Sequence, residues 1–482
     1  INDRLDIEFC IKKNKTYILQ CRPLTGSKKK INKEKLREVI VNLKKKFNKI
    51  NRINETLFGK KTVLSNMSDW NPAEIIGKKP TKLAFSLYSE LITNSIWAEQ
   101  RKNYGYKNVH PNKLMLNFAG SPYIDLRVDL NSFLPNDLNE SISKKLINYF
   151  IKKIKKNPAI HDKIEFELIS TCYDFDLFSK DLPLSKAEKK IYFSSLKKLT
   201  NNIISPKNNL INKELDKIET LKKQIETINK SKLSHIQKIY YLIDYCKKYG
   251  TLPFAGIARC AFISKSILDS LKIKNLIDNK DIDNFYLSIN TVSKSINHEF
   301  YLSQKKNSYK NFIKKYGHLR PSTYSISVMN YKKNYKNYFS NNIQSNDLKN
   351  INKFNFNINK VSKINRIFKK NGFNFTFNQF LKFAKLSIEN REYSKLIFTK
   401  SIDEIFNNLN KLAKEIKIDP KIIEHLDIDI ILKSFHDLEQ EKLKKIILRN
   451  IDVNEKSYKF SQNILLPDVI YDQKNFFCYQ NF

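Results

Sequence analysis

Cysteine, glycine and arginine are scarce in this sequence, and long apolar runs are missing. The six cysteines are widely spaced and form no C-x-x-C pair, which argues against a disulfide framework or a zinc site and favours reduced thiols in a cytoplasmic protein. No apolar run reaches the roughly 18 residues that a membrane-spanning helix needs, and no secretory leader is recognisable. We therefore expect no membrane partner. The sequence shows no repeat of fixed period, which argues against a solenoid.

The formal net charge of +40 raises the question of nucleic-acid binding, because a basic surface releases counterions when it covers phosphates. Lysine, asparagine and isoleucine crowd the whole chain, however, as expected from a genome rich in A and T. The basic residues are mostly lysines and are scattered, with no single basic stripe, which argues against a nucleic-acid partner. A basic helical module that binds RNA or an acidic partner stays open as an alternative.

Arginine is informative because lysine is the default cation here. Only eleven arginines occur, and the planar guanidinium suits bidentate contacts with carboxylates and phosphates. Five of them lie in segments that also hold several of the nine glycines: Arg22, Arg101, Arg127, Arg259 and Arg320. These segments are the first places to look for a site.

The periodicity predicts a mainly α protein with a small β element. Residues 4–24 alternate as a β-hairpin around the loop Lys13–Lys15, and residues 114–130 resemble two short strands. Most other segments show helical spacing, including 208–249, 376–390 and 401–416. Asn71 can cap a short helix with Pro72 at its first position and Glu74 three residues after the cap. We expect four parts along the chain: a hairpin at 1–26, a linker helix within 27–60, a helical domain over 61–455 with a mobile segment at 331–360, and an extended linker at 456–482.

The hairpin carries polar side chains at opposed positions. Its register places Glu8 opposite Gln20 and Asp6 opposite Arg22, all on one face. Oxygens of Glu8 and Gln20 could hold Mg²⁺, and Arg22 could clamp a phosphate. From these residues alone, an exposed sheet face with an Asp–Arg pair is an open alternative.

The stretch D-I-E-F-x9-L-Q-C-R-P-L-T at residues 6–25 resembles the end of the ATP-grasp domain in phosphoenolpyruvate synthase, pyruvate phosphate dikinase and related phosphotransferases. The resemblance implies that Glu8 and Gln20 bind the metal of the nucleotide and that Arg22 contacts its phosphates. It therefore implies ATP and Mg²⁺ as cofactors.

Four further segments resemble the middle region of a subgroup of this family, which places an acceptor-binding domain between the ATP-grasp and phosphohistidine domains. They are DWNPAEIIG (69–77), LYSELITNSIWAEQRKNYGY (87–106), YGTLPFAGIAR (249–259) and YGHLRPSTY (316–324). Rifampin phosphotransferase and L-glutamine kinase share that domain order, and the glutamine-kinase branch is the nearer match. The resemblance implies transfer of a phosphoryl group from ATP through a phosphohistidine to a small molecule, with the amide of L-glutamine as one acceptor. Phosphoenolpyruvate synthase acting on pyruvate is the alternative.

Six candidate acceptor-binding residues lie in these segments: Asp69, Glu74, Arg101, Arg259, His318 and Arg320. Arg127, in the stretch 114–130, is the seventh, and each of the seven has a purely structural alternative. None of the seven histidines stands in the T-S-H context typical of the phosphate carrier. The sequence starts at Ile1 and stops at Phe482 without a clear boundary, so we expect an internal piece that lacks most of the ATP-grasp domain and the whole phosphohistidine domain. Such a piece should not turn over ATP alone.

Overall fold

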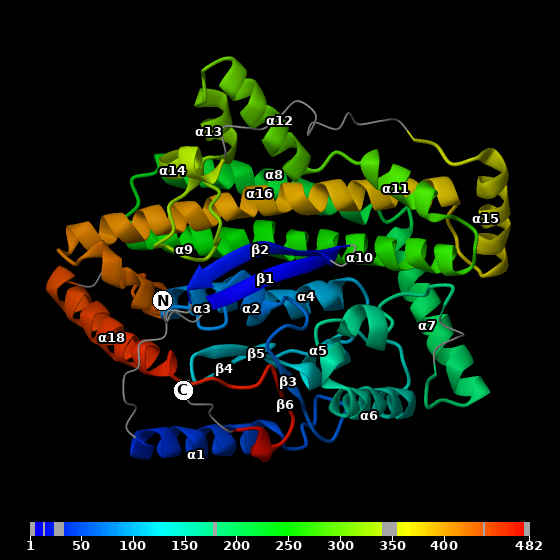
Figure 1. Cartoon of the computed structure of the whole chain (residues 1–482), viewed down its shortest axis with the longest axis horizontal. Coiled ribbons are helices and arrows are strands. Elements are labelled where there is room, and N and C mark those ends of the chain that lie inside the picture. Colours follow the sequence, from blue (N-terminus) through cyan, green and yellow to red (C-terminus); the bar gives the residue numbers. More distant parts are fainter. Residues whose placement is uncertain are drawn as a thin grey trace.

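Helices dominate the protein, as the periodicity predicts. The computed structural model describes residues 5–12, 15–23, 33–176, 181–339, 354–436 and 439–476. In this part of the chain the β structure is confined to one two-stranded and one four-stranded sheet. Figure 1 shows the long helices lying across the molecule above the four-stranded sheet, with helix α1 (Lys33–Ile50) on the far side of that sheet.

The central layer consists of α16 (Phe377–Glu415), α10 (Leu252–Ile273), α9 (His235–Cys246) and α8 (Leu210–Lys230), which pack on one another around a single large apolar core. The sequence predicts two helices where α16 runs unbroken. That prediction was wrong because no glycine or proline interrupts residues 377–415, so the polar stretch in the middle continues the helix. A capping box between Thr376 and Gln379 fixes its start.

The predicted helix 208–249 is in fact two helices, α8 and α9. Ser234 and Gln237 form a capping box that starts α9 anew. A π-helical turn, η5 (Lys247–Thr251), then joins α9 to α10. Within the described residues, the stretch His235–Ile273 is the one helix long and apolar enough to cross a membrane, but 72% of its most apolar window is buried inside the protein. It packs as a core helix of this fold.

The four-stranded sheet has the order β4-β5-β3-β6 and positions the segments that follow its strands. Strands β4 (Met115–Phe118) and β5 (Ser121–Asp125) form the predicted pair. The strand prediction over 126–130 was wrong, because helix α5 (Leu126–Ser132) begins there. The side chain of Asp125 accepts hydrogen bonds from the backbone N–H groups of Arg127 and Val128 and so caps the new helix.

The predicted linker at 456–482 packs against the rest of the protein in its described part, up to residue 476. Helix α18 (Gln440–Ser461) continues into it, and strand β6 (Val469–Ile470) pairs with β3 (Leu64–Ser65). In the segment predicted to be mobile, residues Tyr331–Tyr338 form helix α14 and Ile358 starts helix α15 (Ile358–Lys370). Residues 340–353 and 477–482 lie outside the described residues.

The hairpin consists of β1 (Leu5–Lys12) and β2 (Lys15–Pro23), and Glu8 pairs with Gln20 as predicted. The loop is tighter than predicted, because Lys12 pairs with Lys15 and a register shift after Glu8 absorbs the extra residue. Four apolar side chains of the hairpin are exposed: Phe9, Ile11, Tyr17 and Ile18.

Candidate functional site

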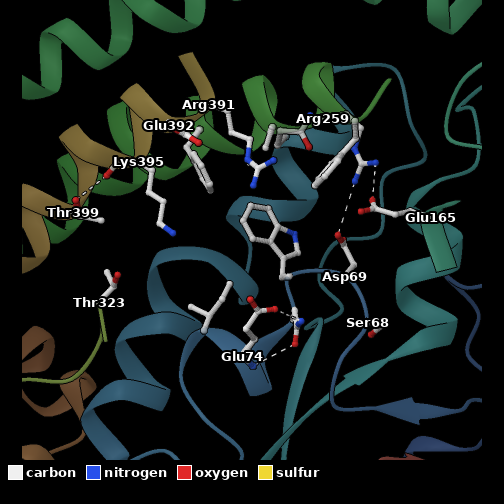
Figure 2. Close-up of a pocket in the computed structure, with 18 of the residues that line it drawn as sticks. Ser68, Asp69, Glu74, Glu165, Arg259, Thr323, Arg391, Glu392, Lys395 and Thr399 are labelled. Atoms are coloured by element: carbon white, nitrogen blue, oxygen red, sulfur yellow. Dashed lines mark hydrogen bonds and ion pairs between the residues drawn. The ribbon is translucent and has the colours of Figure 1, made fainter. Parts of the chain in front are cut away.

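One pocket of about 660 Å³ brings together residues that are far apart in the sequence (Figure 2). It is lined from the segment after β3 with helix α2 (Pro72–Ile75), from α4 (Ile96–Asn103), from α10, from the loop after α13 (Lys310–Tyr316) and from α16. Five of the seven predicted acceptor-binding residues line it: Asp69, Glu74, Arg101, Arg259 and Arg320. Arg127 and His318 are not among the described residues that line it.

The base of the pocket is a buried network of charges. Arg101 Nη2 lies 2.5 Å from Asp69 Oδ2, and Arg259 Nη2 lies 3.9 Å from the other oxygen of the same carboxylate. Arg259 Nη1 also donates to Glu165 Oε2 at 2.9 Å, from the π-helical turn η3 (Ile164–Leu168). The two arginine side chains are only 1% and 4% exposed. The carboxylates of Asp69 and Glu165 therefore compensate two guanidinium groups that water cannot reach.

An aromatic ring helps to hold the two arginines in place. The guanidinium carbon of Arg101 lies 4.1 Å from the ring centre of Phe133, and that of Arg259 lies 4.8 Å from it. Such contacts stabilise a desolvated cation by roughly 2 kcal/mol. Burial, and then the charge of Arg259, lower the pKa of Arg101.

Asp129 lies beside this network and was not predicted. It sits on α5, lines the pocket and is 0% exposed. Neither of its carboxylate oxygens has a hydrogen-bond partner among the described residues. Burial raises the pKa of Asp129 well above its usual range, and the nearby charge of Asp69 raises it further.

Several other buried polar atoms of the lining residues also lack a hydrogen-bond partner within the described part of the chain. They are Ser68 Oγ, Trp70 Nε1, Gln100 Nε2, Arg101 Nε and Nη1, and Arg259 Nε. Buried polar groups in folded proteins are nearly always paired, because an unpaired group costs about 1–3 kcal/mol. Their concentration at one pocket indicates that its wall is arranged to pair with a polar ligand.

The backbone at the pocket is strained in the segment that carries the tryptophan. Trp70 has φ 64° and Asn71 has φ 23°, a region that bulky residues rarely adopt. Tyr88 holds this turn by donating to the Trp70 carbonyl at 2.6 Å. Asn71 caps α2 with Pro72 at its first position, and its amide donates to Glu74 Oε2 at 2.6 Å, which confirms the predicted helix start. Strain of this kind concentrates at binding sites.

Helix α16 forms the opposite wall and contributes two cations that the sequence did not single out. Arg391 and Lys395, one helical turn apart, point into the pocket (Figure 2). No carboxylate among the described residues lies within ion-pair distance of either. Their neighbour Glu392 accepts instead from the backbone N–H of Ser293 at 3.1 Å. Burial, and then the charge of Arg391, lower the pKa of Lys395. These two cations are therefore available to an anion.

Arg320 reaches the pocket, but its charge is already paired. Its guanidinium forms a buried ion pair with Asp403, and Asn330 donates to the same carboxylate at 3.0 Å. This pair attaches the segment after α13 to α16. Arg320 thus lines the pocket from a rigid position and offers it less charge than the sequence suggested.

His318 and Arg127 make contacts of a structural kind. The Nε2–H of His318 donates to the Leu396 carbonyl at 2.8 Å, and burial lowers the pKa of His318 to about 4. Arg127 donates to the carbonyls of Ile50 and Arg52 at 2.8 and 2.7 Å and so fixes the end of α1. These contacts are the kind expected if both residues have a purely structural role and do not bind the acceptor.

The predicted nucleotide-binding residues Glu8, Gln20 and Arg22 lie on the hairpin. Glu8 is exposed, while the side chains of Gln20 and Arg22 fall outside the described part of the structure. No group of three or more histidine, cysteine or acidic residues is arranged to hold a metal ion in the described ranges. A Mg²⁺ ion held by Glu8 and Gln20, with phosphates completing its shell, stays a prediction.

Comparisons with known protein families and with curated proteins found no match for this chain.

Proposed function

We propose that this chain forms the acceptor-binding part of an ATP-dependent phosphotransferase of the phosphoenolpyruvate-synthase type. In such an enzyme a phosphoryl group passes from ATP through a phosphohistidine to a small molecule. One observation carries the proposal. All four motif segments of the resemblance contribute to a single pocket: 69–77 through Asp69 and Glu74, 87–106 through Arg101, 249–259 through Arg259, and 316–324 through Arg320.

The two walls of the pocket suit the two reactants of a phosphoryl transfer. Arg391 and Lys395 on α16 would hold the oxygens of the incoming phosphoryl group, whose charge spreads during transfer. The buried network around Asp69, Arg101 and Arg259 would hold and orient the acceptor. Fixed charges in a site shielded from water stabilise a developing charge without reorganising.

The unpaired atoms of the base favour an acceptor that both donates and accepts hydrogen bonds. Asp129 offers two acceptor oxygens, while Gln100 and Trp70 offer unpaired N–H donors. A carboxamide has two N–H donors and one carbonyl acceptor, so the amide of L-glutamine fits this set. Pyruvate in its keto form has no N–H or O–H group to donate to Asp129. A volume of about 660 Å³ accommodates either molecule.

The hairpin fits the proposal as the edge of a nucleotide site. Glu8 and Gln20 would hold Mg²⁺ and Arg22 would contact phosphates, as the resemblance implies. The exposed side chains of Phe9, Ile11 and Ile18 are apolar, and they would be covered where the rest of an ATP-grasp domain packs on the hairpin. The metal would neutralise phosphate charge in such a site. The chain without those partner domains would not turn over ATP.

The proposal is tested by titrating the chain calorimetrically with L-glutamine, pyruvate and L-leucine. We expect saturable binding of L-glutamine, weakened by Gln100→Leu because this substitution removes an N–H donor of the base, and no binding of L-leucine. The intact polypeptide, joined to its ATP-grasp and phosphohistidine domains, should then form AMP in the presence of the bound acceptor. Binding of pyruvate alone would favour the synthase alternative. RNA binding that falls steeply with salt, with no small-molecule binding, would support the basic-module hypothesis instead.

A further inference from the structure

Asp129 differs from the other buried acids of the pocket because it has no hydrogen-bond partner in the part of the chain that the structure describes. Asp69 pairs with Arg101 at 2.5 Å, and Glu165 pairs with Arg259 at 2.9 Å. Asp129 is equally withdrawn from water, at 0% exposure, yet both of its oxygens lack a hydrogen bond within the described residues. Helix α5 fixes it in the pocket wall. A buried carboxylate left in this condition opposes folding, so a role in function would explain its presence.

The charged side chains that act on Asp129 are of both signs. Arg101 on α4 and Arg259 on α10 attract its carboxylate, while Asp69 and Glu165 repel it. Because burial is the largest influence, the pKa of Asp129 lies well above its ordinary value. A carboxylate in such surroundings takes up a proton more readily than one in water, which is the property of a general base.

The other two acids are less suited to that task. Asp69 is held between two guanidinium groups and Glu165 accepts from Arg259, so protonation of either would break an ion pair. Protonation of Asp129 breaks no hydrogen bond with any described residue.

We propose that Asp129 accepts the proton of the acceptor during phosphoryl transfer. This role rests on the proposed phosphotransferase function. In the bound state an N–H or O–H group of the acceptor donates to Asp129. As the phosphorus–nitrogen bond of the phosphohistidine breaks, its electron pair stays on the imidazole, whose other nitrogen carries a proton. The acceptor atom forms the new bond to phosphorus and passes its proton to Asp129, which loses that proton when the product leaves.

The test follows single-turnover transfer from the phosphorylated intact polypeptide to L-glutamine. Asp129→Asn keeps the size of the side chain but cannot take up the proton. We expect its transfer rate to fall by about 10²- to 10⁴-fold, while the affinity for the acceptor changes by no more than about threefold and the rise of the rate with pH is lost. Asp216→Asn alters an exposed acid of α8 that does not line the pocket and should leave the transfer rate within about twofold of the wild type.

A second variant separates a chemical role from a structural one. Asp129→Ala leaves space for a small carboxylate, so added formate should restore part of the transfer rate in that variant and should not change the rate of Asp216→Asn. Transfer by Asp129→Asn with the rate and pH profile of the wild type, or no response of Asp129→Ala to formate, would overturn the role of Asp129. If the wild-type enzyme transfers no phosphoryl group to any acceptor, the proposed function itself fails.

Discussion

Arg101 and Asp69 form an ion pair that is almost fully withdrawn from water. The contact between Nη2 and Oδ2 is 2.5 Å, and the side chains are 1% and 8% exposed. The second oxygen of Asp69 faces Arg259 at 3.9 Å, so one carboxylate serves as the counter-ion of two buried guanidinium groups. The pair joins two of the motif segments and fixes the base of the pocket.

Replacing Asp69 by asparagine should therefore destabilise the protein severely. Arg101 would keep its charge in a buried site and would face Arg259 without the shared counter-ion. We expect a loss of about 3–5 kcal/mol in the free energy of unfolding, as for other buried pairs that lose one partner, measured by denaturant titration. Glu140→Gln, which removes an exposed pair with Lys144, should cause no measurable loss. A loss below about 1 kcal/mol for Asp69→Asn would contradict this account.

His318 should make the stability of the protein depend on pH in the acidic range. Its pKa is about 4 in the folded state against 6.5 ordinarily, so the unfolded chain takes up a proton first as the pH falls. The folded state is then disfavoured progressively between pH 6.5 and about 4, by up to about 3 kcal/mol. His318→Asn, which cannot titrate, should lack this loss. The prediction would be refuted if the free energy of unfolding had the same pH dependence in the wild type and in His318→Asn.

Local sequence signals predicted those parts of the fold and site that depend on neighbours along the chain. The pairing of Glu8 with Gln20 follows from strand alternation, and the start of α2 follows from Asn71 and Pro72. Arg101 and Arg259 stand out because arginine is scarce, and both line the pocket.

The predictions that were wrong or incomplete concern features that depend on a helix cap or on tertiary packing. Asp129 lies in a stretch that alternates like a strand, and only the capping contact of Asp125 makes it helical. Arg391 is another of the scarce arginines, but no glycine lies near it on α16. A search for arginines in segments that also contain glycine therefore does not select it. Nothing in the sequence around Lys395 distinguishes it from the many other lysines. Only the packing of α16 against the motif segments places it in the pocket.

The buried carboxylate of Asp129 should lower the stability of the wild-type protein at neutral pH. Because the pKa of Asp129 is raised in the folded state, its ordinary value being 3.8, the folded protein binds more protons than the unfolded chain above that value. Stability is therefore lost as the pH rises. Asp129→Asn should melt at a higher temperature than the wild type at pH 7.5, and the difference should narrow as the pH approaches 4.

Calorimetric melting of the matched variant Asp162→Asn supplies the control for Asp129→Asn. This acid is exposed, so its replacement should leave the melting temperature close to that of the wild type across the same range. A lower melting temperature for Asp129→Asn at pH 7.5 would mean that the charge of Asp129 stabilises the arginine network. That result would contradict the raised pKa on which the prediction depends.

Arg391 and Lys395 should determine how tightly the pocket binds anions. Hydrogen bonds to a charged group contribute about 1.5–3 kcal/mol, so Arg391→Gln and Lys395→Gln should each weaken binding of inorganic phosphate about 10- to 100-fold. Neither substitution removes an ion pair with a described residue, so the free energy of unfolding should not fall. Calorimetric titration with phosphate and denaturant titration check the two expectations.

Lys385→Gln is the matched control, because it removes a largely exposed lysine of the same helix that does not line the pocket and lies 4.0 Å from Glu389. Phosphate affinity should be unchanged in this variant. Since Arg391 and Lys395 lie one turn apart, they should address the same anion, and the double variant should lose less affinity than the two single losses added together. Additive losses would place the two cations at separate anions and would remove the support that α16 gives to a single phosphoryl site.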